Sequence, residues 1–303
     1  MTVTKVSHFD IRKKIVANMT TESWHNIPHV SYLYDADATE FLKVVKELNQ
    51  QNRPRKITIN MVLMKVVAEC LKAAPKCNAH IEFNHKYVTG TIKEIKEIDM
   101  SIPMMLPSDE MMTINLHNMG ERSLDNIAEL MEITRKKLAN TNPTEAMFSV
   151  SMDNTLKALK KGRLGVVIRR LIGAKIGKSR VVLLKGKAKR EYNAIPEDER
   201  ITYRDIEQGT VTFSNVGSIC RDQRGMPALL EIIPPQVFAL VASAVQKKPV
   251  VVTDENGNDK VEIREMIPFC IAFDHRAMDF DGVVPFLRRM YDIFDHPEQI
   301  KNW

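Results

Sequence analysis

The sequence contains no apolar run approaching the roughly 18 residues that a membrane-spanning helix needs, so we predict no span. Its first residues, MTVTKVSHFDIRKK, include no apolar stretch suited to a secretory signal. The spacing of the four cysteines fits neither a disulfide framework nor a zinc site. These absences predict a cytoplasmic protein with reduced thiols and no bound metal.

Charge is unevenly distributed along the chain. Thirteen basic residues and no Asp or Glu lie between Lys157 and Arg190, whereas the rest of the chain holds 31 basic and 38 acidic residues. Such segregation predicts a partner or ligand of negative charge. We expect no nucleic acid, because the only aromatic residue of this region, Phe148, precedes the charges.

Helical and strand-like patterns alternate, which predicts a single mixed α/β domain over residues 1–303. Helices are expected at residues 10–23, 38–50, 60–74, 123–138, 146–172 and 283–294. Strands are expected at residues 29–37, 81–83, 87–92, 98–105, 112–116, 180–184, 210–213, 236–242, 250–253, 261–264 and 266–273. Residues from about 142 to 190 are interpreted as an insertion into this domain.

The strongest chemical signal is a histidine at a junction between elements. An apolar strand is expected to end at Asp274-His275, and a helix is expected to begin near Asp281. A neutral imidazole held at such a junction can take a proton from a thiol or hydroxyl near pH 7. His275 is therefore the first catalytic candidate, and the alternative is a structural histidine.

Five ordered blocks resemble the catalytic domain of 2-oxo acid dehydrogenase E2 components, the dihydrolipoamide acyltransferases. They are Ile11–Met19 (IRKKIVANM), Ala74–Ala79 (APKCNA), Thr210–Ser218 (TVTFSNVGS), Ile232–Val237 (IIPPQV) and Asp274–Ile300, which begins DHRAMD. The family patterns they resemble are IRKKIAENM, FPxLNA, GTFTISNxGS, INPPQV and DHRxxDG. The resemblance implies a chloramphenicol acetyltransferase-like fold, a two-layer sandwich in which helices flank a mixed sheet.

The resemblance also implies a coenzyme A-dependent acyltransferase whose acceptor is a thiol such as dihydrolipoamide. It assigns His275 as general base, Ser214 as hydrogen-bond donor to the oxyanion, and Asp279 as the structural aspartate that pairs with Arg12. It implies a homotrimer or larger cage in which His275 and Ser214 come from different chains. Without the resemblance, Ser214 is a turn residue before Gly217, and Arg12 lies on a solvated helix face.

The sequence departs from the family pattern in three ways. Phe280 replaces the motif glycine, so it reshapes the acyl end of the pocket, weakens the activity, or fills the core at a helix start. The chain carries no lipoyl or peripheral-subunit-binding domain, so a lipoyl group is expected in trans on a separate lipoyl-carrying protein. The basic insertion has four interpretations: a solvated arm on the acidic body, membrane-surface contact, contact with an acidic partner, or attraction of coenzyme A phosphates.

Two other functions remain open beside transfer to a thiol. One keeps the fold and moves the acyl group from coenzyme A to a hydroxyl or amine. The other is a non-catalytic scaffold that assembles dehydrogenase subunits. His275 and Ser214 favour an enzyme, whereas Phe280 and the missing carrier domains favour the scaffold.

Overall fold

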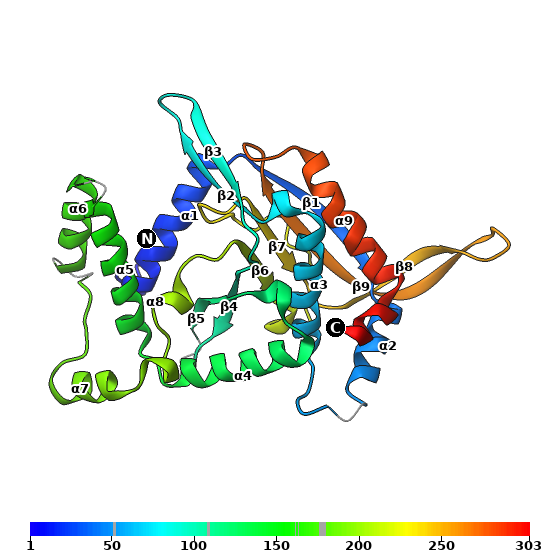
Figure 1. The fold of residues 1–303 in the computed structure, drawn as a ribbon, viewed down its shortest axis with the longest axis horizontal. Helices are drawn as coiled ribbons and strands as arrows, with labels where there is room; N and C mark the ends of the chain where they lie inside the picture. The colour runs from blue at the N-terminus through cyan, green and yellow to red at the C-terminus, as the bar shows by residue number, and fades with distance from the viewer. Residues whose placement is uncertain (51–52, 108–109, 161, 163, 176–179) are drawn as a thin grey trace. The chain divides into compact units, whose positions relative to one another are not determined.

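The computed structural model describes residues 1–50, 53–107, 110–160, 162, 164–175 and 180–303 (Figure 1). The chain divides into two compact units. Unit 1 comprises Met1–Glu22, Met104–Asn115 and Glu132–Gln208, and unit 2 comprises Ser23–Pro103, Leu116–Met131 and Gly209–Trp303. No helix among the described residues is long and apolar enough to cross a bilayer.

Unit 2 is built on a mixed β-sheet. The strands follow the order β1 (His29–Asp37), β9 (Asp259–Asp274), β7 (Phe238–Ala242), β6 (Val211–Asn215), β4 (Met100–Met105) and β5 (Met111–Leu116), and β8 (Gln246–Thr253) also pairs with β9. Strands β1, β7 and β8 run antiparallel to β9, whereas β6 runs parallel to β7 and β4. The division between the units falls inside β4 and β5.

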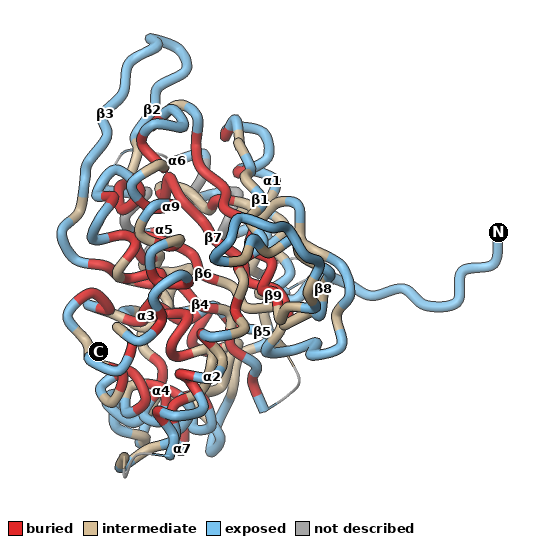
Figure 2. Tube along the Cα trace, turned by 90° about the vertical axis from the view of Figure 1, so that its right-hand side faces the viewer, coloured by how far each residue is buried: buried red, intermediate tan, exposed pale blue. Residues whose placement is uncertain are grey.

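The core of unit 2 surrounds the central strands. All five residues of β7 are buried, and so is every residue of β9 from Met266 to Asp274. Figure 2 shows these buried stretches in red. The rings of Phe238 on β7 and Phe286 lie 4.9 Å apart, centroid to centroid, so aromatic packing joins the sheet to the helix that follows β9.

Helices α3 (Ile59–Ala73) and α9 (Phe280–Asp295) pack against one another in unit 2. The hydroxyl of Thr58 caps α3 by accepting the N–H of Met61 at 3.3 Å, and Pro75 follows its end. Helix α9 buries an apolar face that includes Phe286 and Met290. This unit also contains α2 (Thr39–Leu48) and the separate hairpin of β2 (Ala79–Asn84) and β3 (Thr89–Glu94).

Unit 1 is mainly helical. It contains α5 (Pro143–Lys160), α6 (Leu164–Lys175), α7 (Gly186–Ala194) and α8 (Tyr203–Ile206), and it shares α1 (Ile11–Asn26) and α4 (Leu124–Ala139) with unit 2. Helices α5 and α6 lie side by side. The buried carboxylate of Glu145 on α5 accepts the N–H of Leu184 at 2.6 Å and pairs with Lys189 on α7. This one side chain ties the segment after α6 back to α5.

Several predicted boundaries were wrong. The strand expected at residues 180–184 is irregular chain, because the N–H of Leu184 bonds a side chain instead of a neighbouring strand. The helix expected at 146–172 is two helices, and α7 was not predicted. The strands expected at 261–264 and 266–273 are one continuous strand, β9, whose first part pairs only with β8.

The basic segment between Lys157 and Arg190 is described in part. Its residues Lys161, Arg163 and Lys178 lie outside the described residues, and only the backbone of Lys157, Arg169, Arg170 and Lys175 is described. The basic side chains that the structure does describe are Lys160, Arg180, Lys185, Lys187, Lys189 and Arg190. Of these six, only Lys189 is not exposed.

Candidate active site

His275 follows directly after the last residue of β9, as the sequence predicted. Its backbone N–H donates to the carbonyl of Pro28 at 3.1 Å, which fixes it beside the start of β1. The imidazole is 52 % exposed, and its Nδ1 lies 3.3 Å from Oδ1 of Asp279. Its Nε2 has no hydrogen-bond partner among the described residues, so this nitrogen is available to a substrate.

Asp279 is placed to orient that imidazole. It occupies the N-cap position of α9, but its exposed carboxylate caps no backbone N–H. The two side chains are four residues apart across the turn that joins β9 to α9. A carboxylate on Nδ1 favours the tautomer that carries its proton on Nδ1 and leaves Nε2 as a base.

A buried ion pair holds the turn that carries His275. The carboxylate of Asp274 is fully buried and accepts from Arg276 at both oxygens, with Nε 3.0 Å from Oδ1 and Nη2 2.6 Å from Oδ2. The backbone N–H of Arg276 also donates to Oδ1 at 2.9 Å. A buried carboxylate is stable only when it is paired in this way. These hydrogen bonds between Asp274 and Arg276 therefore hold the turn, and with it His275, in one conformation. The sequence analysis did not identify this supporting pair.

His29, which faces Asp274 across the β1–β9 ladder, is a second, half-buried support. Its Nε2 accepts the N–H of Ile232 at 3.1 Å, which requires an unprotonated Nε2. Burial lowers the pKa of His29 from its ordinary value of 6.5, against smaller opposing effects from Ile27 and Asp274. The native state therefore holds this imidazole neutral.

This lowered pKa predicts a pH-dependent stability. Protonation of His29 favours the unfolded chain, so the free energy of unfolding should fall as the pH drops below about 6.5 and toward the folded-state pKa. Urea denaturation between pH 7.5 and 5.5 measures this fall. The His29→Gln variant cannot titrate at this position and should show a shallower decline, although it is less stable at pH 7.5. If the free energy of unfolding fell equally with pH in the wild-type protein and in the variant, the fall could not be due to His29.

Ser214 lies near the end of β6, in the motif Ser214-Asn215-Val216-Gly217-Ser218. Its half-buried hydroxyl has no hydrogen-bond partner among the described residues. The next residue is tied down instead: Asn215 Oδ1 accepts the N–H of Ser218 at 3.2 Å, and Asn215 Nδ2 donates to Asn60 at 3.0 Å. The Ser214 hydroxyl thus lies near the end of a strand whose next residue is held in place. Among the described residues it donates no hydrogen bond, so it can donate one to a ligand.

Gly217 is required in this motif for steric reasons. A Cβ at this position would lie 2.6 Å from Cα and 2.7 Å from N of Ala244, which follows β7. Both are backbone atoms, so a side chain cannot be accommodated by a change of rotamer. The glycine lets the turn after β6 pack directly on the chain that leaves β7.

We expect Gly217→Ala to destabilise the protein by about 1–3 kcal/mol, the usual cost of overpacking. The Cβ that it adds collides with Ala244. Chemical denaturation checks this against Gly225→Ala, where an added Cβ meets nothing within 4 Å. Equal denaturation midpoints for the two variants would show that the close contact between Gly217 and Ala244 does not exclude a side chain at position 217.

One chain does not bring Ser214 and His275 together. The strand register places Ser214 opposite Val241 on β7, and Val241 opposite Cys270 on β9. His275 is five residues beyond Cys270, at the other end of these strands. Strand spacing and rise make this about 10 Å across the sheet and about 17 Å along it, or roughly 19 Å in all. The two groups cannot act on one atom from within the same chain.

The sequence matches the family described as 2-oxoacid dehydrogenases acyltransferase (catalytic domain) over residues 2–152 and 186–301. The chain belongs to this family. The resemblance inferred from the five sequence blocks is thus confirmed. Residues 153–185 fall outside the matched segments. That residues 1–303 form a single domain with an insertion at about 142–190 stays a prediction.

A curated relative from Corynebacterium glutamicum, the dihydrolipoyllysine-residue acetyltransferase component of the pyruvate dehydrogenase complex, is 24% identical over 287 residues. The match covers 92% of this chain and 32% of that protein. The chain spans about a third to a half of the length of the curated relatives that it matches over most of its own length. It is therefore a homologue of their acyltransferase catalytic domains.

Two solved structures show the same fold. The dihydrolipoamide acetyltransferase of Azotobacter vinelandii, studied for the role of a serine, a histidine and an asparagine in its catalytic mechanism, gives a TM-score of 0.64 at 18% identity, covering 99% of this chain and 94% of that one. The cubic core of a pyruvate dehydrogenase multienzyme complex gives 0.63 at 18% identity, with the same coverage. They confirm the predicted fold class, a mixed sheet flanked by helices.

Phe280, which replaces the glycine of the E2 motif, is the first residue of α9. Its ring is 43 % exposed and lies 5.4 Å from the ring of Tyr32, so the interpretation as a core aromatic is wrong. Its φ is not positive, so the backbone here does not require a glycine.

Arg12 lies in α1 within unit 1, and its guanidinium pairs with Glu110 at 2.7 Å and with Asp10 at 3.7 Å. Asp279 lies in unit 2. The pairing of Arg12 with Asp279 that the E2 resemblance implies stays a prediction.

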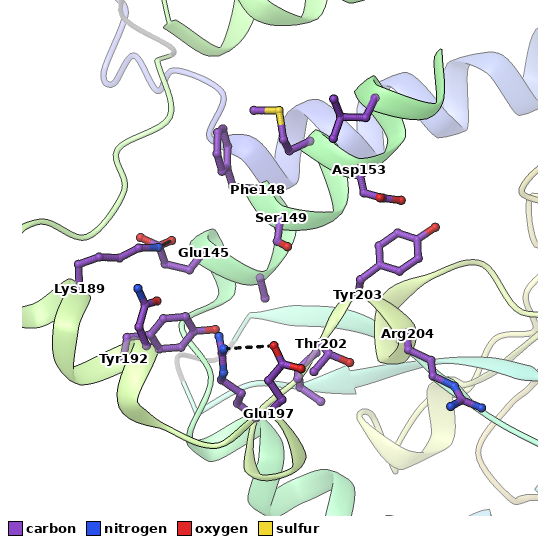
Figure 3. A pocket seen from close by; sticks show the side chains of 16 residues that line it. Glu145, Phe148, Ser149, Asp153, Lys189, Tyr192, Glu197, Thr202, Tyr203 and Arg204 are labelled. Carbon is purple, nitrogen blue, oxygen red and sulfur yellow. Dashed lines mark hydrogen bonds and ion pairs between the residues drawn. The ribbon is translucent and has the colours of Figure 1, made fainter. Parts of the chain in front are cut away.

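Unit 1 contains a cavity of about 730 Å³ between α5, α7 and α8 that no sequence pattern indicated. Figure 3 shows the Glu145–Lys189 contact at one side, with Phe148 and Tyr203 among the other lining side chains. The guanidinium of Arg200 lies 5.1 Å from the ring centroid of Tyr192. Neither His275 nor Ser214 lines this cavity.

The described residues include no cluster of three or more His, Cys, Asp or Glu side chains that could hold a metal ion. Cys70, Cys77 and Cys270 are buried, and burial raises the pKa of each thiol, so none is poised as a nucleophile. His275 and Ser214 remain the catalytic candidates that the sequence indicated.

Proposed function

We propose that the protein transfers acyl groups between coenzyme A and a thiol acceptor such as dihydrolipoamide. Membership of the acyltransferase family supports the reaction class. The names of the curated relatives, dihydrolipoyllysine-residue acetyltransferase and lipoamide acyltransferase, support the thiol acceptor. The observation that carries the proposal is the His275 imidazole at the end of β9, with Nδ1 on Asp279 and Nε2 open to a substrate.

In this reaction His275 is the general base. Its Nε2 takes the proton of the attacking thiol, and the thiolate sulfur then bonds to the carbonyl carbon of the thioester. The tetrahedral intermediate breaks its other C–S bond, and the imidazolium returns the proton to the leaving thiolate. The same residue thus serves both directions of transfer, because each partner is a thiol in one state and a thioester in the other.

Asp279 positions the imidazole and stabilises its charged form. The spacing of four residues between His275 and Asp279 matches that between the histidine and the asparagine studied in the Azotobacter vinelandii enzyme. Because the Asp279 carboxylate is exposed, its contribution to this stabilisation is screened by water. Asp279 therefore acts mainly by holding the tautomer and the ring orientation.

Ser214 stabilises the negative oxygen of the tetrahedral intermediate by donating its hydroxyl hydrogen. Its free hydroxyl on the rigid end of β6 suits this role. The roughly 19 Å that the strand register leaves between Ser214 and His275 supports a site completed by a second chain. A homotrimer, or a larger cage built of trimers, supplies such a site, with His275 from one chain and Ser214 from the next.

Both substrates bind at this shared site. Coenzyme A is one substrate, and a lipoyl group carried by a protein is the other. Phe280 lies one residue after Asp279, and its partly exposed ring fits contact with the acyl portion of the substrate. On this account Phe280 replaces the motif glycine to shape the acyl pocket.

Acyl transfer by the purified full chain tests this proposal. We expect S-acyl-dihydrolipoamide and free coenzyme A to form together when acyl-coenzyme A and dihydrolipoamide are supplied, as measured by chromatography. Turnover only with an alcohol or amine acceptor would replace the thiol by another acceptor of the same reaction class. The absence of turnover with every thiol, alcohol and amine would leave the scaffold interpretation.

A further inference from the structure

Helix α6 carries an apolar stripe that faces solvent. Leu164, Ile168 and Ile172 recur every four residues, so they follow one face of the helix. Their exposed fractions are 59 %, 57 % and 51 %. Three large aliphatic side chains side by side in water form the kind of patch that marks an interaction site.

The orientation of this stripe is fixed within unit 1. Helices α5 and α6 pack side by side, and we call this pair of helices the α5–α6 hairpin. On α6, Val167 and Ala174 are half-buried, whereas the stripe remains exposed. Leu156 and Leu159 add two exposed aliphatic side chains at the adjoining end of α5. Exposed aliphatic side chains therefore occur on both helices of the hairpin.

Positive charge is concentrated on the same segment. The thirteen basic residues between Lys157 and Arg190 begin in α5, continue through α6 and end in α7, with no acidic residue among them. Of the basic side chains that are described, Lys160, Arg180, Lys185, Lys187 and Arg190 are exposed. Residues 153–185 lie outside the matched segments of the acyltransferase family, so family membership gives this segment no role.

These two properties together favour one occupant. The phosphates of a nucleic acid would pair with the basic side chains but would leave the aliphatic stripe exposed. A neutral apolar surface would cover the stripe but would leave the basic side chains unpaired. An anionic bilayer uses both, because aliphatic side chains enter the acyl boundary while Lys and Arg remain among the headgroups. None of the described helices is long and apolar enough to cross the bilayer.

We infer that the α5–α6 hairpin binds the surface of an anionic phospholipid bilayer. The apolar stripe of α6 inserts at the level of the headgroups, and the basic segment from Lys157 to Arg190 attracts the negative lipids. This binding is independent of acyl transfer, because neither His275 nor Ser214 belongs to the hairpin. It places the enzyme on a membrane without requiring a spanning segment.

Vesicle flotation of the chain comprising residues 1–303 tests this inference. We expect binding to vesicles of phosphatidylcholine with phosphatidylglycerol, at least about tenfold weaker binding to phosphatidylcholine alone, and a similar loss in 0.5 M salt. The double variant Ile168→Glu/Ile172→Glu should lose at least about tenfold in affinity for the anionic vesicles. The control Ile133→Glu changes an exposed isoleucine on α4 and should bind as wild type does.

Two results would overturn the inference. One is the absence of wild-type binding to anionic vesicles, and the other is equal binding by the double variant. Because the altered side chains are exposed, circular dichroism should show unchanged folding of all the variants. Acyl transfer measured on the same preparations separates this question from the catalytic one, since vesicle binding does not depend on turnover.

Discussion

The His275→Ala variant is expected to transfer acyl groups at least about 100-fold more slowly than the wild-type chain, the lower end for loss of a general base. The imidazole Nε2 is the described group placed to take the thiol proton at the end of β9. Without it, the reaction depends on the small fraction of thiol that is already ionised. The loss should appear in kcat, because the mutation removes proton transfer rather than substrate contacts.

The matched control for this variant is His296→Ala. His296 is also an exposed histidine beside a carboxylate, with Nδ1 4.0 Å from Glu298, but it follows α9 rather than β9. Because both side chains are exposed, neither substitution should lower the free energy of unfolding appreciably. The measurement is the initial rate of coenzyme A release by each variant. Similar rates for His275→Ala and His296→Ala would exclude His275 as the general base.

Ser214→Ala should lower kcat by about 100- to 1000-fold and leave KM little changed, the usual result of removing one oxyanion donor. The hydroxyl makes no hydrogen bond among the described residues, so its loss should not disturb the fold. Its contribution is made only when negative charge develops on the thioester oxygen. This difference between kcat and KM distinguishes oxyanion stabilisation from substrate binding.

Ser218→Ala provides the comparison within the same motif. The hydroxyl of Ser218 donates to the carbonyl of Asn215 at 2.7 Å and so belongs to the turn. This variant should lose some stability while its kcat stays within a fewfold of wild type. If Ser214→Ala and Ser218→Ala had the same kinetic effect, Ser214 would be a turn residue and not an oxyanion donor.

The sequence was informative where the relevant pattern was local. The apolar run of β9 ending at Asp274 predicted where His275 would lie, and the strands expected at 250–253 and 261–264 lie in the paired strands β8 and β9. The sequence did not predict how far the two strands of that hairpin pair, because pairing depends on residues that are not neighbours in the chain. The polar start of β9 extends beyond the core and pairs only with β8, so one strand was predicted as two.

The supports of the candidate site could not be predicted, because they join residues far apart in the chain. His29 meets Ile232 across 203 positions, and nothing near His29 in the sequence indicates this contact. The strand from 180 to 184 was wrongly predicted because its apolar residues suited a sheet, whereas Leu184 found its partner in Glu145. Helical periodicity also continues from α5 into α6, which hid the break between these helices.

The E2 resemblance implied that Ser214 and His275 come from different chains, and the strand order and register give the distance at which one chain holds them. In the sequence they are two motif residues, and nothing local distinguishes a site within one chain from a site between chains. The ladder from β6 through β7 to β9 places them at opposite ends. Catalysis by both residues therefore requires a second copy of the chain.

The activity of mixed assemblies tests this central claim most directly. His275→Ala and Ser214→Ala chains carrying different tags are co-expressed, and assemblies that contain both are isolated. Each parent variant lacks one group at every site, whereas a mixed trimer has one complete site among three, so about one third of the wild-type rate should return. Mixed assemblies no more active than their parents, or chains that never copurify, would contradict a site shared between chains.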